Sequence, residues 1–205
     1  MNTKNRVGLF GGTFNPIHLG HLRVAEEALK QCGLKKVVFL PTGKPPHREV
    51  AEGVPGELRY EMVRLAIQGR PGFEVSRLEL SCPGPCYTID TVRTMSARHP
   101  EGVAYILGAD AFLEIETWKD WQQLLESCPF IVAPRTGIPR EAFARPPFTG
   151  ADVFFLKMEE IDLSSSEIRR AYREGLPTQG LVPRAVDEFI RAHHLYGVAR
   201  NRSVG

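Results

Sequence analysis

The chain has 205 residues, of which 42% are hydrophobic and 24% charged, and its formal net charge is +2. This composition predicts one globular domain spanning residues 1–205, with a helical C-terminal part from about residue 164. The small net charge gives no indication of a nucleic-acid partner. The start of the chain lacks the apolar core of a signal peptide, and no apolar run is long enough to cross a membrane. We therefore expect a cytoplasmic protein without a membrane partner.

The four cysteines do not have the spacing of a zinc site. They are Cys32, Cys82, Cys86 and Cys128, and only the middle two are close in the sequence. There is no CxxC and no second pair at zinc-ligand spacing. We expect isolated, mostly buried thiols.

Apolar runs and helical periodicity alternate along the chain. The runs predict strands at 7–10, 36–40, 73–81 (with a bulge), 103–107, 130–133 and 153–156. Periodic apolar positions predict helices from about 18 to 33, at 58–69, from 87–88 onward, at 168–174 and at 183–194. Residues 41–57 and 138–150 are expected to be irregular. The alternation predicts an α/β fold with a mainly parallel central sheet and helices on both faces.

The first strand, turn and helix carry the most specific chemistry. The turn from Gly11 to Phe14 lets backbone come close to a ligand, and the start of the next helix favours a phosphate. His18 and His21 are three residues apart, so their imidazoles share one face of that helix. Gly20 between them has no side chain that would cover this part of the helix surface. The pattern predicts a phosphate site.

A second helix start offers similar chemistry. Residues Ser164 to Glu167 have the spacing of a capping box, and Arg169 follows in the first turn of the helix. By itself this pattern indicates a helix cap and a surface arginine. Together with the two histidines it predicts a cradle for a triphosphate.

Further candidates lie near other strand ends and helix starts. Gly108 and Asp110 follow the predicted strand 103–107, where open α/β sheets bind ligands. Asp110 either orders a magnesium–nucleotide complex or holds its loop by hydrogen bonds. Thr88 opens a helix that can meet an anion. Of two nearby tryptophans, Trp121 is expected in the core and Trp118 at a ligand.

Several of these stretches resemble a known family. GGTFNPIHLGHL (11–22) and LSSSEIR (163–169) resemble the two signatures of the nucleotidyltransferase superfamily. PTGKPPHR (41–48), CYTIDTV (86–92), ILGADAF (106–112) and ETWKDW (116–121) resemble, in order, bacterial nicotinate-nucleotide adenylyltransferases. The similarity covers nearly the whole chain. Asn15 stands where the family usually has Asp, and the second signature has serine where threonine is common, which keeps the hydroxyls.

The resemblance implies a Rossmann-like nucleotidyltransferase fold and an adenylyl transfer from ATP to nicotinate mononucleotide in NAD biosynthesis. Magnesium would accompany ATP, without a metal site built from protein side chains. A homo-oligomer is compatible with the sequence. The implied catalytic residues are His18, His21 and Arg169. The implied ATP site adds Gly11, Gly12, Thr13, Phe14, Gly108, Asp110, Ser165 and Ser166. The implied substrate contacts are Thr88, Trp118, Lys44, His47, Arg48 and Arg135.

Other functions fit less of the sequence. A phosphopantetheine adenylyltransferase or a cytidylyltransferase shares the signatures, but the former should lack CYTIDT and ETWKDW. A non-catalytic nucleotide sensor would keep the fold without releasing pyrophosphate. A dehydrogenase needs GxGxxG after the first strand, where this chain has GGTFNP. A tRNA synthetase fragment would carry a KMSKS-like stretch, which is absent.

Overall fold

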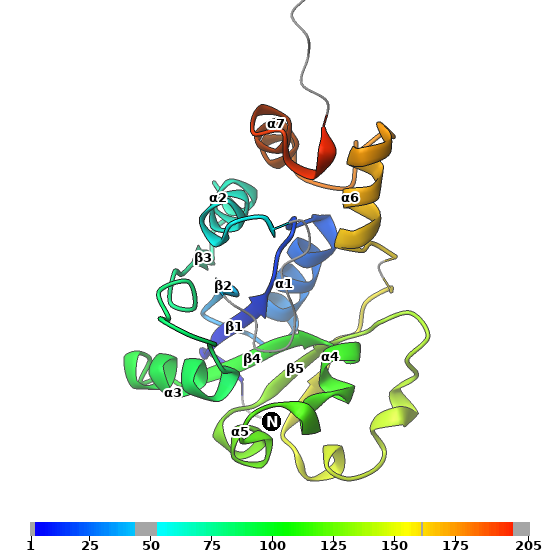
Figure 1. Ribbon diagram of the computed structural model, residues 1–205. Coiled ribbons are helices and arrows are strands. Elements are labelled where there is room, and N and C mark those ends of the chain that lie inside the picture. The colour runs from blue at the N-terminus through cyan, green and yellow to red at the C-terminus, as the bar shows by residue number, and fades with distance from the viewer. Residues whose placement is uncertain (1–2, 44–52, 161, 199–205) are drawn as a thin grey trace, which may run out of the picture.

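The protein is built around one parallel sheet (Figure 1). The computed structural model describes residues 3–43, 53–160 and 162–198. The strands are β1 (Val7–Gly12), β2 (Lys36–Pro41), β3 (Phe73–Val75), β4 (Val103–Gly108), β5 (Phe130–Ala133) and β6 (Val153–Phe155). They are arranged in the order β3-β2-β1-β4-β5-β6, and each neighbouring pair is parallel. The predicted Rossmann-like fold class is confirmed.

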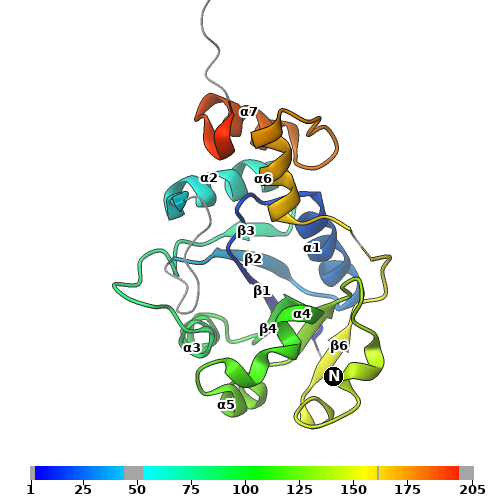
Figure 2. The same cartoon turned by 45° about the vertical axis from the view of Figure 1, so that its right-hand side comes forward.

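Helices cover both faces of the sheet (Figure 2). One face carries α1 (Leu19–Gln31), α2 (Gly56–Ile67), α6 (Ser165–Glu174) and α7 (Arg184–Ala192). The other carries α3 (Thr88–Arg98), α4 (Ala109–Leu113) and α5 (Trp121–Ser127). Short 3-10 turns lie at η2 (Ile115–Thr117), η3 (Arg140–Phe143), η4 (Phe148–Gly150) and η5 (Leu195–Gly197). Among the described residues, no helix has the length and hydropathy to span a membrane.

Alternate residues of each strand enter different cores. Phe10 and Ile106 pack on the α1 side, whereas Leu9 and Tyr105 pack on the α3 side, all with at most 6% exposure. Because both faces are covered, these strands are apolar at successive positions rather than at every second one. This explains why the strands appear in the sequence as short continuous apolar runs.

The predicted strand at 73–81 is too long and is wrong beyond residue 75. The register places Val75 opposite Phe39 of β2, and the Ser76 N–H still donates to the Phe39 carbonyl over 2.9 Å. The next bond of the ladder would need an N–H at Pro41 to donate to the Ser76 carbonyl, and proline has none. The chain turns instead, with the Leu78 N–H donating to Ser76 Oγ and the Ser81 N–H to the Arg77 carbonyl. In this turn Leu78 and Leu80 are only half-buried and Glu79 between them is buried, so the alternation in the sequence does not mark a strand face here.

The remaining element predictions are close to the structure. The predicted helix at 168–174 begins three residues earlier, because Ser164 is its N-cap and accepts the Glu167 N–H. Residues 138–150 contain only the turns η3 and η4. Trp121 is half-buried against the α3-side core rather than enclosed by it.

The polypeptide reverses direction across the sheet between β1 and β4, which are adjacent although β2 and β3 intervene in sequence. In open α/β sheets this switch point leaves a crevice at the carboxyl ends of the strands. The glycines that end β1 and β4, Gly12 and Gly108, therefore mark the place for a ligand.

Candidate active site

A cleft of about 860 Å³ opens at this switch point. It brings together residues from nearly every part of the chain that the sequence singled out. Those lining it are Gly11, Gly12, Thr13, His18, His21, Thr88, Gly108, Asp110, Trp118, Arg135, Ser165 and Ser166. Phe14 and Arg169 are not among the lining residues, but each contacts one: Phe14 packs against His21, and Arg169 lies beside Ser166. Lys44, His47 and Arg48 fall outside the described residues.

Two imidazoles stack at the entry of α1. His18 is the N-cap residue, and its ring centroid lies 3.7 Å from that of His21. The His18 N–H donates to His21 Nδ1 over 3.2 Å, so a neutral His21 carries its proton on Nε2. His18 Nδ1 is buried and makes no hydrogen bond to any described residue. Both residues line the cleft.

Burial keeps both imidazoles neutral in the free protein. Desolvation first, and then the charge of the Arg135 guanidinium, lower the pKa of His18 to about 4. The pKa of His21 is also well below 6.5, from burial first and then from the charges of His18 and Arg135. Arg135 lines the same cleft, with its Nη1 3.5 Å from the Leu163 carbonyl, and its charge acts on both histidines.

The first turn is shaped by close packing. At Gly11 any Cβ would collide with the Tyr105 hydroxyl, so a side chain is excluded there. Phe14 has a left-handed backbone (φ +48°) and is 2% exposed. Its ring packs edge-on against Phe10 and His21, with centroids 5.6 and 5.1 Å away. Its side chain holds the turn, and only its backbone is left for a nucleotide.

The second helix start closes the other side of this turn. Ser165 Oγ donates to the Pro16 carbonyl over 3.0 Å. Arg169 donates from Nη1 to the Asn15 carbonyl over 2.9 Å, and its Nη2 lies 3.4 Å from Ser166 Oγ. The two predicted phosphate segments, about 150 residues apart in sequence, are thus in direct contact.

The opposite end of the cleft is aromatic. Thr88 is the first residue of α3, and Trp118 follows η2. The half-buried Trp118 ring stands edge-on to Tyr105, with centroids 6.2 Å apart. A helix start and a tryptophan face one cavity here, as the sequence predicted.

Comparison with known proteins agrees with this geometry. Residues 9–171 match the cytidylyltransferase-like family model. A Symbiobacterium thermophilum protein named "probable nicotinate-nucleotide adenylyltransferase" is 42% identical over 197 residues, covering 93% of this chain and 95% of its own. A Thermus thermophilus protein of the same name is 43% identical over 192 residues, covering 93% and 99%. The chain belongs to the nicotinate-nucleotide adenylyltransferase family.

A solved structure shares the fold of this family member. The Plasmodium falciparum nicotinic acid mononucleotide adenylyltransferase complexed with NaAD superposes with a TM-score of 0.81 at 18% identity. The match covers 95% of this chain and 98% of the other.

Asn15, the departure from the family pattern, has a structural role. Its side-chain Oδ1 accepts a hydrogen bond of 2.7 Å from the Tyr196 hydroxyl, and the residue is 3% exposed. A carboxylate oxygen could accept the same bond. The position ties the first turn to η5 near the C-terminus of the described chain.

Glu79 is a cleft residue that the sequence did not reveal. It is 5% exposed, lines the cleft, and accepts a hydrogen bond of 3.0 Å from Thr91 Oγ1. No ion pair joins it to a cation among the described residues. Burial raises its pKa to about 7, against hydrogen bonds from Thr91 and Thr42 that lower it. An acidic residue within an expected strand gives no sequence signal for such burial.

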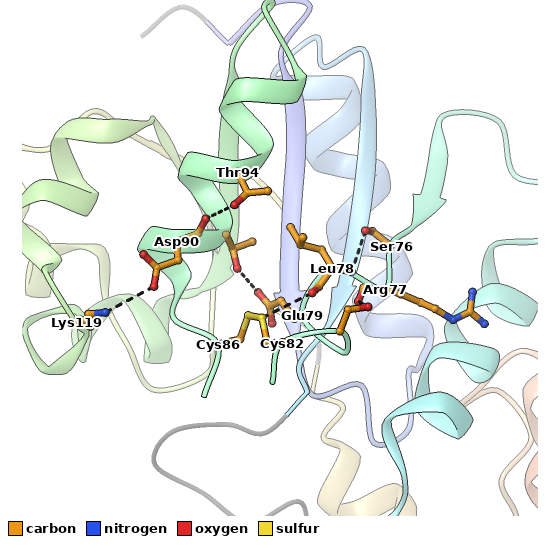
Figure 3. Close-up of a disulfide and its surroundings, with 11 residues drawn as sticks. Ser76, Arg77, Leu78, Glu79, Cys82, Cys86, Asp90, Thr94 and Lys119 are labelled. Carbon is orange, nitrogen blue, oxygen red and sulfur yellow. Dashed lines mark hydrogen bonds and ion pairs between the residues drawn. A yellow bond between two sulfur atoms is a disulfide. The ribbon is translucent and has the colours of Figure 1, made fainter. Parts of the chain in front are cut away.

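The expectation of isolated thiols is wrong for two cysteines. Cys82 and Cys86 form a disulfide, shown with Glu79 in Figure 3. The turn of residues 83–85, Pro-Gly-Pro, brings their Cα atoms to 6.0 Å. Cys86 lines the cleft just before Thr88. Cys32 and Cys128 are buried free thiols, as expected.

A Glu79→Gln variant tests the buried carboxyl. The folded protein keeps a proton on Glu79 that the unfolded chain loses above pH 4.5, so the free energy of unfolding falls as pH rises from 4.5 to 7. An amide does not ionise, so the stability of the variant does not fall in this way. Between pH 4.5 and 8 its free energy of unfolding should therefore rise by about 3 kcal/mol relative to that of the native protein. Urea unfolding at both pH values measures this difference.

The exposed Glu126→Gln is the matched control, with little change expected at either pH. A Glu79→Gln stability difference that does not depend on pH would contradict a buried, protonated carboxyl.

Proposed function

We propose that the protein transfers the adenylyl group of ATP to nicotinate mononucleotide, giving nicotinate adenine dinucleotide and pyrophosphate. The observation that carries the proposal is the stacked His18–His21 pair at the α1 entry, in a cleft that also receives the start of α6. The family names of its relatives support the acceptor.

The reaction needs positioning and charge stabilisation rather than a protein nucleophile. A phosphate oxygen of the mononucleotide attacks the α-phosphorus of ATP in line, and pyrophosphate leaves. We assign the glycine turn and the serines at the start of α6 to the triphosphate. The same cleft is lined by these groups and by Trp118, so both substrates can be held in it together.

The histidines act through their neutral resting state. Negative charge grows on the phosphate oxygens as the bond to pyrophosphate breaks, and imidazole donors stabilise it best when water is excluded. A bound triphosphate favours protonation of His18 and His21, which opposes the desolvation that keeps them neutral in the free protein. Arg135 adds a fixed positive charge beside them.

Magnesium fits this cleft as a partner of ATP. The described residues contain no cluster of three His, Cys, Asp or Glu side chains able to hold a metal ion. Magnesium is commonly held by substrate phosphates and water with one or two carboxylates. Asp110 lines the cleft and would supply a carboxylate, while the bound ion shields the triphosphate charge.

The aromatic end is assigned to the pyridine ring. Trp118 presents a face for a cationic pyridinium. The start of α3 at Thr88 offers N–H donors, and a carboxylate only accepts hydrogen bonds whereas a carboxamide also donates. This arrangement favours the acid over the amide.

The activity is tested by pyrophosphate release with ATP, magnesium and nicotinate mononucleotide. We expect turnover by the native protein and a loss of roughly 100-fold or more in kcat/KM for His18→Ala. The exposed His193→Ala is the control and should match the native rate. Release only with phosphopantetheine, or no release despite ATP binding, would contradict the proposed function.

Acceptor preference is tested by comparing nicotinate and nicotinamide mononucleotides. We expect a kcat/KM at least about tenfold higher for the acid, since the amide's N–H₂ meets donors. Trp118→Ala should raise KM for both compounds and leave KM for ATP unchanged, because the ring is common to both. Trp121→Ala, which does not line the cleft, is the control. Equal efficiency on acid and amide would refute the preference.

A further inference from the structure

A buried guanidinium lies behind the cleft wall. Arg59 of α2 is 1% exposed, and no described carboxylate forms an ion pair with it. Its groups donate to backbone carbonyls instead, over 2.7 Å to Thr13, 2.6 Å to Thr42, 3.3 Å to Val54 and 3.4 Å to Gly43. Burying an unpaired charge is costly, so its retention calls for a reason beyond packing.

The two shortest of these hydrogen bonds go to Thr13, in the turn between β1 and α1, and to Thr42, just after β2. Thr13 and Thr42 both line the cleft, whereas Arg59 does not. Arg59 thus reaches the cleft wall from its buried side and joins two segments that are 29 residues apart in sequence.

Side chains from α2 and α6 bind the turn after β1 at several points. Three of its carbonyls accept side-chain donors: Thr13 from Arg59, Asn15 from Arg169 and Pro16 from Ser165. Between the first two, Phe14 adopts a left-handed backbone that non-glycine residues seldom take. Such a conformation persists where the surroundings determine it.

The hydrogen bond from Arg59 to the Thr13 carbonyl also fixes the orientation of the Phe14 N–H. The C=O and N–H of one planar trans peptide point in opposite directions. Arg59 draws the Thr13 carbonyl toward the buried side, so the N–H of Phe14, in the same peptide, points the other way. That N–H donates no hydrogen bond within the described residues.

We propose that Arg59 is a positioning residue for adenylyl transfer: by fixing the Thr13 carbonyl it aims the Phe14 N–H at the phosphates of ATP. The inference rests on the proposed function for its substrate. Helix α2 thereby contributes to the site through Arg59, although Arg59 does not line the cleft. A lysine cannot replace the planar fork, since an ammonium is a point charge with a different reach.

The kinetic test uses Arg59→Lys, with Arg64→Lys as the matched control on the same helix. Arg64 is exposed and pairs only with Glu61 among the described contacts. At a temperature well below melting, Arg59→Lys should lose at least about tenfold in kcat/KM for ATP, because misplaced donors cost transition-state binding. Arg64→Lys should stay within about twofold.

A purely structural Arg59 gives a different result. Its replacement would lower the melting temperature and leave kcat/KM for ATP of the folded enzyme unchanged, which would overturn the proposal. Native turnover is measured first, so failure of the proposed function is recognised separately from failure of the Arg59 inference.

A second measurement uses the native protein, so it does not depend on whether a core variant folds. In native protein labelled with ¹⁵N-phenylalanine, saturation with ATP and magnesium should move the Phe14 amide proton downfield as it gains a phosphate acceptor. The Phe148 amide, which already donates to the Arg145 carbonyl, should not move and serves as the control. An unmoved Phe14 amide in ATP-saturated protein would overturn the proposal, whatever the variants do.

Discussion

The turn between β1 and α1 must hold backbone donors and two imidazoles against phosphates, and hydrogen bonds from distant elements hold it in place. Its carbonyls accept hydrogen bonds from side chains of α2 and α6, and the Asn15 side chain accepts one from Tyr196 of η5. Helices that look peripheral to the sheet therefore converge on one turn, and in both views α6 and α7 lie at the end of the molecule away from α3 and α5 (Figures 1 and 2). The C-terminal part of the chain is in this sense part of the site.

Burial sets the charge of the cleft as much as the choice of residues does. Desolvation lowers the pKa of His18 and His21 and raises that of Glu79, so all three favour the neutral form. The effects on stability oppose each other. As pH falls below 6.5, the buried histidines lower the free energy of unfolding. As pH falls from 7 to 4.5, the destabilising effect of the buried Glu79 disappears, so its contribution to the free energy of unfolding rises. Below pH 7 the phosphates then meet donors with Glu79 mostly protonated.

The phosphate end of the site was predictable because its residues are contiguous. His18 and His21 share one turn of helix, and the capping box at Ser164 is a local pattern. Glu79, Arg59 and the Cys82–Cys86 pair were not predicted as they occur. Glu79 is buried only because β3 ends at Val75 and the chain turns, and Arg59 is functional only through carbonyls at Thr13 and Thr42. These contacts depend on how distant segments pack, and sequence periodicity does not report that packing. The mainly parallel sheet followed from the alternation of strands and helices, which is local, whereas the strand order came from the structure alone.

The central claim is that the histidine pair rests neutral and responds to the triphosphate. NMR titration of the His18 and His21 ring protons, with and without ATP and magnesium, tests it most directly. We expect both imidazoles to be neutral at pH 7 in the free protein, with the pKa of His18 at about 4, and both to titrate at higher pH when ATP is bound. Imidazoles already protonated at pH 7 in the free protein, or titration curves that ATP leaves unchanged, would contradict it.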